Sequence, residues 1–271
     1  MYPTKYHSPK TLPEALAIFA AAESPKYLSG GHTLLPAMKL RLAAHSDLID
    51  LSGIEEMRGI TSGNNVLTIG AMTRHDEVAN APAVREIIPA LAGCASSIGD
   101  RHVRHRGTIG GSVSNNDPAA DYPAALLSLG ATVITDQRRI AADQFFTGLY
   151  ETALQPGEIL LRVEFPIPKS ASYAKFRSIA SRYSVVGVFV SQTSGGVRVA
   201  VTGAGDGGVF RVKSFEAALN YHFSPDAIAA CNVDPAHLMI DANGSSEYRA
   251  NLIKVMARRA LENPGRTSCY N

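Results

Sequence analysis

Glycines and small polar residues between Arg104 and Asp121 form the stretch of this sequence best suited to chemistry. The stretch reads R-H-R-G-T-I-G-G-S-V-S-N-N-D-P-A-A-D and holds three glycines within five positions, Gly107, Gly110 and Gly111. Glycine tolerates positive φ and lets the backbone approach a ligand closely. We expect a glycine-rich loop, followed by a helix that Asp117 caps, Pro118 begins and Gly130 ends. Such a loop could cradle phosphate groups.

An earlier segment, Ser29 to Leu35, repeats this chemistry after a short apolar run and reads S-G-G-H-T-L-L. Two glycine-rich loops could grip one diphosphate from two sides. Neither segment has the Lys-Ser or Lys-Thr of a Walker A motif or the G-x-G-x-x-G of a Rossmann turn. Because glycine clusters also mark ordinary turns, that alternative stays open.

Several polar side chains in these stretches have both a binding and a structural interpretation. His32 could donate to a phosphate oxygen or shield a ring system, or it could bond locally. Asp121 could accept from ribose or ribityl hydroxyls, or it could favour a helix N-terminus electrostatically. Asn115 and Asn116 suit sugar hydroxyls and equally suit an Asx turn. Three arginines could form a cluster that faces phosphate, or they could lie on a solvated basic surface: Arg101, Arg104 and Arg106.

No set of catalytic side chains is evident from spacing. The sequence lacks a G-x-S-x-G elbow and an H-E-x-x-H motif. Its three cysteines are far apart and have none of the spacings of zinc or iron-sulfur sites, which predicts no metal site: Cys94, Cys231 and Cys269. Any redox chemistry would therefore be carried by a bound cofactor.

The composition is that of a globular protein of two or three compact units. The chain has 271 residues, of which 45% are hydrophobic and 18% charged, and a formal net charge of +2. The absence of a basic run argues against a nucleic-acid partner. No apolar stretch is long enough to predict a transmembrane segment, and no signal core follows the N-terminus. We expect a cytoplasmic protein, with contact to the inner face of the membrane through a partner left open.

Periodicity and caps predict the elements that position these residues. Thr11 and Glu14 have capping-box spacing for a first helix ending near residue 23. Strands at 26–28 and 47–51 and a helix at 34–42 complete a unit over residues 1–53. A second unit, residues 54–170, has strands at 66–70, 131–135 and 159–165 and a helical stretch, 83–98, that Pro89 kinks or splits. A β-rich third unit, residues 171–271, has strands at 174–179, 185–192 and 197–202, then helices at 214–221, 225–230 and 247–261.

Three motifs together resemble the FAD-binding medium subunit of the molybdenum hydroxylases, the family of aerobic carbon monoxide dehydrogenase and xanthine dehydrogenase. They are S-G-G-H-T-L-L-P-A-M-K-L-R-L-A (29–43), I-G-A-M-T (69–73), and R-G-T-I-G-G-S-V with D-P-A-A-D-Y-P-A (106–124). The segment from Arg177 through Y-S-V-V-G-V and the helix at 247–261 also fit, so the resemblance covers the whole chain.

The resemblance implies an α+β fold with two α/β FAD-binding subdomains of the vanillyl-alcohol oxidase type, followed by a C-terminal antiparallel sheet with helices. It also implies the cofactor contacts. The diphosphate and flavin would lie against Ser29, Gly30, Gly31, His32, Thr33 and Leu34. The remaining diphosphate and sugar hydroxyls would lie against Thr108, Gly110, Gly111, Ser112, Asn115, Asp117 and Asp121. Tyr183 and Lys175 would lie near the flavin ring.

The sequence departs from many relatives at Ser114-Asn115-Asn116 and at His105, which affects the contacts around the adenine and ribityl groups. The implied function is to accept electrons from the 2Fe-2S clusters of a small partner subunit and to pass them to an external acceptor. A large partner would hold molybdopterin, and the complex would be a dimer of heterotrimers. A stand-alone flavin oxidoreductase and a non-catalytic flavin-binding interaction module remain alternatives.

Overall fold

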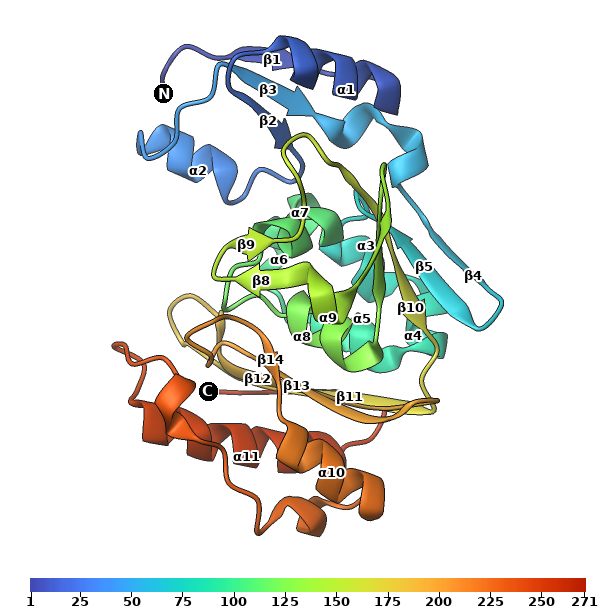
Figure 1. Ribbon diagram of the computed structural model, residues 1–271, viewed down its shortest axis with the longest axis vertical. Helices are drawn as coiled ribbons and strands as arrows, with labels where there is room; N and C mark the ends of the chain where they lie inside the picture. The colour runs from blue at the N-terminus through green and yellow to red at the C-terminus, as the bar shows by residue number, and fades with distance from the viewer.

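The computed structural model describes residues 1–271 and places three β-sheets one after another along the long axis of the molecule (Figure 1). The first sheet is parallel, with strand order β1-β3-β2. Its strands are β1 (Lys5–His7), β2 (Pro25–Leu28) and β3 (Asp47–Asp50). The connecting helices are α1 (Leu12–Ala21) and α2 (Leu34–Lys39), and two short 3-10 turns follow, η1 (Leu51–Gly53) and η2 (Glu55–Met57).

The central sheet is antiparallel throughout, with strand order β4-β5-β10-β6-β7. Its strands are β4 (Ile60–Gly63), β5 (Val66–Gly70), β6 (Thr132–Thr135), β7 (Arg139–Ala141) and β10 (Leu160–Pro166). A small separate hairpin pairs β8 (Phe146–Gly148) with β9 (Glu151–Thr152). Helices accompany this sheet: α3 (His75–Asn80), α4 (Pro82–Ile87), α5 (Pro89–Ser96), α6 (Arg101–Arg106), α7 (Ile109–Asn115), α8 (Tyr122–Leu129) and α9 (Ala142–Phe145).

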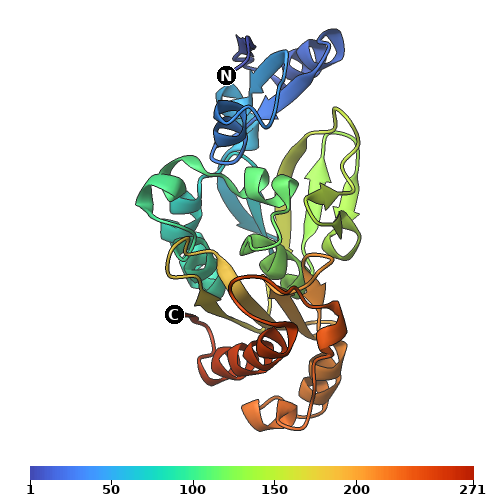
Figure 2. The ribbon, with the colours of Figure 1, turned by 90° about the vertical axis from the view of Figure 1, so that its left-hand side faces the viewer.

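The third sheet has strand order β14-β13-β12-β11-β15 and is antiparallel except that β15 runs parallel to β11. Its strands are β11 (Ser170–Arg177), β12 (Ser184–Thr193), β13 (Gly196–Thr202), β14 (Phe210–Arg211) and β15 (Thr267–Tyr270). The helical elements here are α10 (Lys213–Tyr221), α11 (Ser246–Glu262), η3 (Pro225–Ile228) and η4 (Pro235–His237). In both ribbon views α10 and α11 lie at the end of the molecule opposite the first sheet (Figure 1, Figure 2).

Both faces of the third sheet are buried, each in a different hydrophobic core. Val186, Val188 and Val199 belong to a core shared with α10 and α11. Tyr173 and Phe189 belong to a larger core that also contains residues of α5, α8 and the first two sheets. Because strand side chains alternate between faces, one sheet can contribute to two cores. The third sheet is therefore packed against the rest of the molecule through an apolar face.

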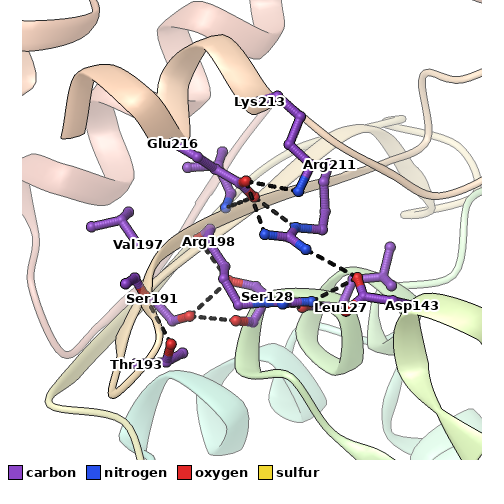
Figure 3. A network of polar contacts seen from close by, with 12 residues as sticks. Leu127, Ser128, Asp143, Ser191, Thr193, Val197, Arg198, Arg211, Lys213 and Glu216 are labelled. Atoms are coloured by element: carbon purple, nitrogen blue, oxygen red, sulfur yellow. Dashed lines mark hydrogen bonds and ion pairs between the residues drawn. The ribbon is translucent and has the colours of Figure 1, made fainter. Parts of the chain in front are cut away.

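A polar network lies where α8 and α9 meet β13, β14 and α10 (Figure 3). Arg198 Nη2 donates to both carboxylate oxygens of Asp143 at 2.7 Å, and Arg211 Nη1 donates to Asp143 Oδ1 at 3.1 Å. Arg211 also pairs with the buried Glu216, at 2.7 and 2.9 Å. Ser128 Oγ and Ser191 Oγ bond across the same boundary at 3.1 Å. This network ties α9, which accompanies the central sheet, to β13 and β14 of the third sheet.

The structure corrects the expected local structure of the glycine stretch. Gly110 and Gly111 lie in the first turn of α7 with negative φ, so they do not form a loop. Asp117 does not cap a helix: its side chain accepts from Ala119 N at 2.9 Å, and α8 begins at Tyr122. Gly130 ends α8 with φ 64°, as predicted. Residues 225–228 form a 3-10 turn where an α-helix was expected.

Candidate cofactor-binding site

The segment from Gly30 to Leu34 connects β2 to α2 and presents a run of free backbone donors. None of the five successive N-H groups, from Gly30 to Leu34, donates to an acceptor in the protein. Gly31 has φ +75°, a conformation that an L-residue with a side chain rarely adopts. Successive N-H groups in such a turn form a concave site for an anion. The side chains of His32 and Thr33 are exposed here, and Leu34 begins α2.

This segment is in direct contact with the start of α7, although the two lie about 80 residues apart in the sequence. Ser29 Oγ and Thr108 Oγ1 are 2.6 Å apart. A Cβ atom at Gly30 would lie 2.5 Å from the Arg106 carbonyl oxygen, and one at Gly111 would lie 3.3 Å from Ser29 Oγ. Glycine at both positions therefore permits the close approach. The sequence predicts that the Ser29–Leu35 segment and the glycine stretch act together, and the two are adjacent in the structure.

The first N-H groups of α7 are already engaged within the protein. Ile109 N donates to Thr73 O at 3.0 Å and Gly110 N donates to Ala71 O at 2.9 Å. Gly111 N donates to Thr108 Oγ1 at 3.0 Å, which makes Thr108 the N-cap of the helix. The segment 71–75 thus backs the start of α7, a role that sequence reasoning missed. The available backbone donors lie on the Gly30–Leu34 side, while α7 offers the unpartnered side chains of Ser112 and Asn115.

A pocket of about 210 Å³ lies beyond the C-terminal end of α7. Its lining includes Asp117, Tyr150, Tyr183 and Arg249. Tyr150 Oη donates to Asp117 Oδ2 at 3.4 Å, and burial raises the pKa of both tyrosines. Tyr183 was named from the sequence, whereas Tyr150 was missed. Tyr150 has φ +57° at the tip of the β8-β9 hairpin, a conformation that tyrosine rarely adopts and that its residue type does not indicate.

Asp121 and Lys175 are buried and paired with each other. Lys175 Nζ lies 2.9 Å from Asp121 Oδ2 and donates to Ser97 O at 3.3 Å. Ser184 Oγ donates to Asp121 Oδ1 at 2.9 Å, and Tyr173 Oη donates to the same oxygen. Burial raises the pKa of Tyr173 well above its usual range. The structure thus brings Asp121 and Lys175 together as a buried ion pair between α8 and β11.

Two other residues weighed from the sequence have structural contacts. Asn116 is buried with φ 44°, and its amide donates at 2.8 Å to the carbonyl oxygens of Gly148 and Glu151. Arg104 Nη1 donates to Ile98 O at 2.9 Å. Arg101 and Arg106 are exposed on α6. Asn116 therefore anchors the β8-β9 hairpin, and Arg104 bonds to the backbone of the preceding loop.

The amino-acid sequence of this chain is similar to sequences of known proteins. The family model for the FAD binding domain in molybdopterin dehydrogenase matches residues 2–168. The carbon monoxide dehydrogenase medium chain of Hydrogenophaga pseudoflava is 33% identical over 278 residues, covering 95% of each chain. The nicotine 6-hydroxylase medium subunit of Paenarthrobacter nicotinovorans is 32% identical, covering 96% of this chain and 97% of that one.

The fold agrees as well. A solved structure of carbon monoxide dehydrogenase from Hydrogenophaga pseudoflava contains a chain that superposes with a TM-score of 0.85 at 34% identity, with 96% of each chain covered. This likeness confirms the predicted α+β fold class. No helix in the protein has both the length and the apolarity needed to cross a bilayer. The chain belongs to the FAD-binding medium subunits of the molybdenum hydroxylases, the oxidoreductase family that includes carbon monoxide dehydrogenase and xanthine dehydrogenase.

Proposed function

We propose that this chain holds FAD with its diphosphate against the Gly30–Leu34 segment and the start of α7. The observation that carries the proposal is the run of five backbone N-H groups without a protein acceptor, beside the paired hydroxyls of Ser29 and Thr108. A diphosphate carries negative charge and many acceptor oxygens, which such donors satisfy without a basic side chain. When bound, the flavin supplies the capacity to take up and release electrons one or two at a time.

The remaining predicted contacts follow α7 away from the diphosphate. Seven helical residues span roughly 10 Å at about 1.5 Å each. Thr108, Gly110, Gly111 and Ser112 would lie near the diphosphate, and Asn115 and Asp117 would lie toward the sugar and the flavin. Tyr183, half exposed at the pocket, would lie against the ring.

Asp121 and Lys175 stay in the proposal as a buried pair behind the ring. The Asp121 carboxylate already accepts hydrogen bonds from Tyr173, Lys175 and Ser184. A bond from a sugar hydroxyl to this carboxylate would therefore add to those partners or replace one of them. The same holds for Lys175, whose ammonium group is already engaged by Asp121 and Ser97.

We infer that the chain works in a complex, as an electron carrier between partner subunits and an external acceptor. The relatives are named as medium chains or subunits, which supports association with a 2Fe-2S subunit and a molybdopterin subunit in a dimer of heterotrimers. One is named for carbon monoxide and the other for nicotine, yet both match this chain equally well over nearly its whole length. That similarity supports substrate selection in another subunit. We place the domain boundaries after residues 53 and 170, the first after the parallel sheet and the second at the first residue of β11.

The decisive experiment is FAD uptake by the purified chain and by the complex that copurifies with it. We expect the absorbance band of bound flavin at about 450 nm. We also expect the protein to retain the cofactor through gel filtration. Gly111→Val should abolish retention, because a Cβ there already lies 3.0 Å from Thr108 Oγ1 and 3.3 Å from Ser29 Oγ. Gly63→Val is the matched control, since a Cβ at Gly63 meets nothing within 4 Å. A folded chain that takes up no FAD would refute the proposal.

A further inference from the structure

His75 is a buried histidine that none of the roles above uses. It is the first residue of α3, is 4% exposed, and its backbone N donates to Gly107 O at 2.9 Å. Its neighbours Thr73 and Arg74 continue the contact, through Ile109 N and through a bridge between Arg74 and Thr108. The histidine therefore lies behind the junction between α6 and α7.

The imidazole occupies the space next to the Cα of Gly107. A Cβ atom at Gly107 would lie 2.5 Å from Nε2 and 2.8 Å from Cδ2 of His75. The ring also packs against Tyr122, with the ring centroids 5.4 Å apart. The ring is thus in contact with a buried tyrosine of α8 and with the backbone that leads into α7.

The ring acts through its shape. Nδ1 of His75 and Oη of Tyr122 are both buried and have no hydrogen-bond partner. Burial, together with the nearby charges of His32 and Arg104, lowers the pKa of His75 to about 3, so the imidazole is neutral at ordinary pH. A neutral ring without hydrogen bonds positions its neighbours by van der Waals contact.

Gly107 connects this ring to both sides of the proposed site. The Arg106 carbonyl, one residue earlier, lies against Gly30. The Thr108 hydroxyl, one residue later, bonds Ser29 Oγ at 2.6 Å and Gly111 N at 3.0 Å. We propose that His75 is a positioning residue of the cofactor site, whose ring fixes Gly107 and through it the spacing between Gly30 and the start of α7. This inference rests on the proposed function.

A double-mutant cycle between positions 75 and 107 tests the contact. FAD dissociation constants would be measured by fluorescence quenching, with thermal unfolding of the FAD-free chain as a separate measure of folding. We expect His75→Ala to weaken binding about tenfold and Gly107→Ala to weaken it more. The double variant should bind about tenfold more tightly than Gly107→Ala alone, because the smaller side chain at 75 makes room for the new methyl group. No improvement in the double variant would overturn the proposal.

Gly110→Ala is the matched control for that rescue. A Cβ at Gly110 would lie 2.7 Å from the Ala71 carbonyl oxygen, and its nearest neighbours include no atom of His75. His75→Ala should therefore leave the binding defect of Gly110→Ala unchanged. An equal rescue at both glycines would show a general loosening of the region and would refute a specific contact.

A second pair of variants covers the case in which Gly107→Ala does not fold. His75→Leu keeps a similar side-chain volume and should bind FAD within about threefold of the unsubstituted chain, whereas His75→Ala should not. Equal affinities for the two variants would contradict a role through shape. If the unsubstituted chain itself took up no FAD, the proposed function would fail, and this inference with it.

Discussion

Single residues near the proposed site differ in whether they are accessible to solvent or enclosed by protein. Gly31, His32 and Thr33 are accessible, whereas Asp121 and Lys175 are enclosed by protein. A buried ion pair contributes little net stability compared with apolar packing, but the loss of one partner leaves a charge without compensation. The Asp121-Lys175 pair should therefore be sensitive to the loss of either charge.

Asp121→Asn tests this sensitivity. The change leaves the Lys175 ammonium buried without its counter-charge, so we expect the free energy of unfolding to fall by about 3–5 kcal/mol. Urea unfolding followed by circular dichroism would measure it. Asp117→Asn is the matched control, since Asp117 is only partly buried and its contacts tolerate an amide, and it should change the free energy by less than about 1 kcal/mol. Similar losses for the two variants would argue against a buried ion pair.

Glu158 makes the stability of the protein depend on pH. Its carboxylate accepts two bonds from Arg138 at 2.9 Å, one from Thr135 Oγ1 and one from Gln155 N. The Arg138 bonds are the main reason that the pKa of Glu158 falls from 4.5 to about 2. Because the folded-state pKa is the lower one, this stabilisation is complete above about pH 4.5 and is lost as the pH falls toward about pH 2.

The Glu158→Gln variant should therefore lose less stability on acidification than the unsubstituted chain. Urea midpoints measured from about pH 5 to about pH 3 would give the slope for each protein. We expect the variant to be less stable at neutral pH and to approach the unsubstituted chain at the acid end. Parallel slopes would show that another carboxylate controls this range.

At the scale of elements, strong local patterns were predictive. The Thr11 cap, the split at Pro89 and the stop at Gly130 all occur where the sequence placed them, because each depends on a residue with one dominant conformational preference. The strands at 185–192 and 197–202 match β12 and β13 to within a residue at each end. The short edge strands β1 and β15 were missed, since pairing with distant partners defines them more than their own composition does. The edge strand β4 was missed although it forms a hairpin with the neighbouring β5.

The sequence predicts a loop at Gly110 and Gly111, whereas the structure has a helix there, and the difference has a physical reason. Gly110 and Gly111 are poor helix formers, so local propensity favours a loop. The structure overrides that propensity with the Thr108 cap and with backbone bonds to Thr73 and Ala71. These partners lie some 35 residues earlier, where no local rule can find them. The adjacency of Ser29 and Thr108 was expected only because both segments had the chemistry of one ligand.

Thr108→Val tests whether this cap serves the site as well as the helix. Valine keeps the shape of threonine but removes the bonds to Gly111 N and Ser29 Oγ, so stability should fall by about 1 kcal/mol and FAD affinity by at least tenfold. Thr11→Val is the matched control, because Thr11 caps α1 in the same manner, accepting from Glu14 N at 3.4 Å. It should lower stability similarly and leave FAD affinity unchanged. Equal losses of affinity would refute a role specific to the site.

At the scale of the molecule, the polar network around Asp143 connects the third sheet to α9 beside the central sheet. Partial burial tends to raise the pKa of Asp143, but the hydrogen bonds and charges of Arg198 and Arg211 outweigh that effect and lower it. Arg198 also donates to Leu127 O at 2.7 Å, which ties it to α8. The Asp143 carboxylate therefore accepts hydrogen bonds from two arginines of the third sheet at once.

Asp143→Asn should weaken this junction without unfolding the protein. We expect a loss of about 1 kcal/mol in the free energy of unfolding, together with faster hydrogen exchange in β13 and β14. Asp206→Asn provides the comparison, because Asp206 forms only an exposed pair with His237 at 3.7 Å. Unchanged exchange in the Asp143 variant would show that the apolar packing alone holds the junction.

The position of β10 in the central sheet has a consequence for how the chain folds. β10 is the middle strand, and its partner β5 precedes it by the whole of residues 71–159. During synthesis the central sheet cannot close until residues 160–166 leave the ribosome, and until then α7 and α8 lack one of the strands that they contact. Long-range strand pairing slows folding and prolongs exposure of apolar surface. Recombinant yield of this chain should therefore rise when translation is slowed by cooling or when chaperones are coexpressed.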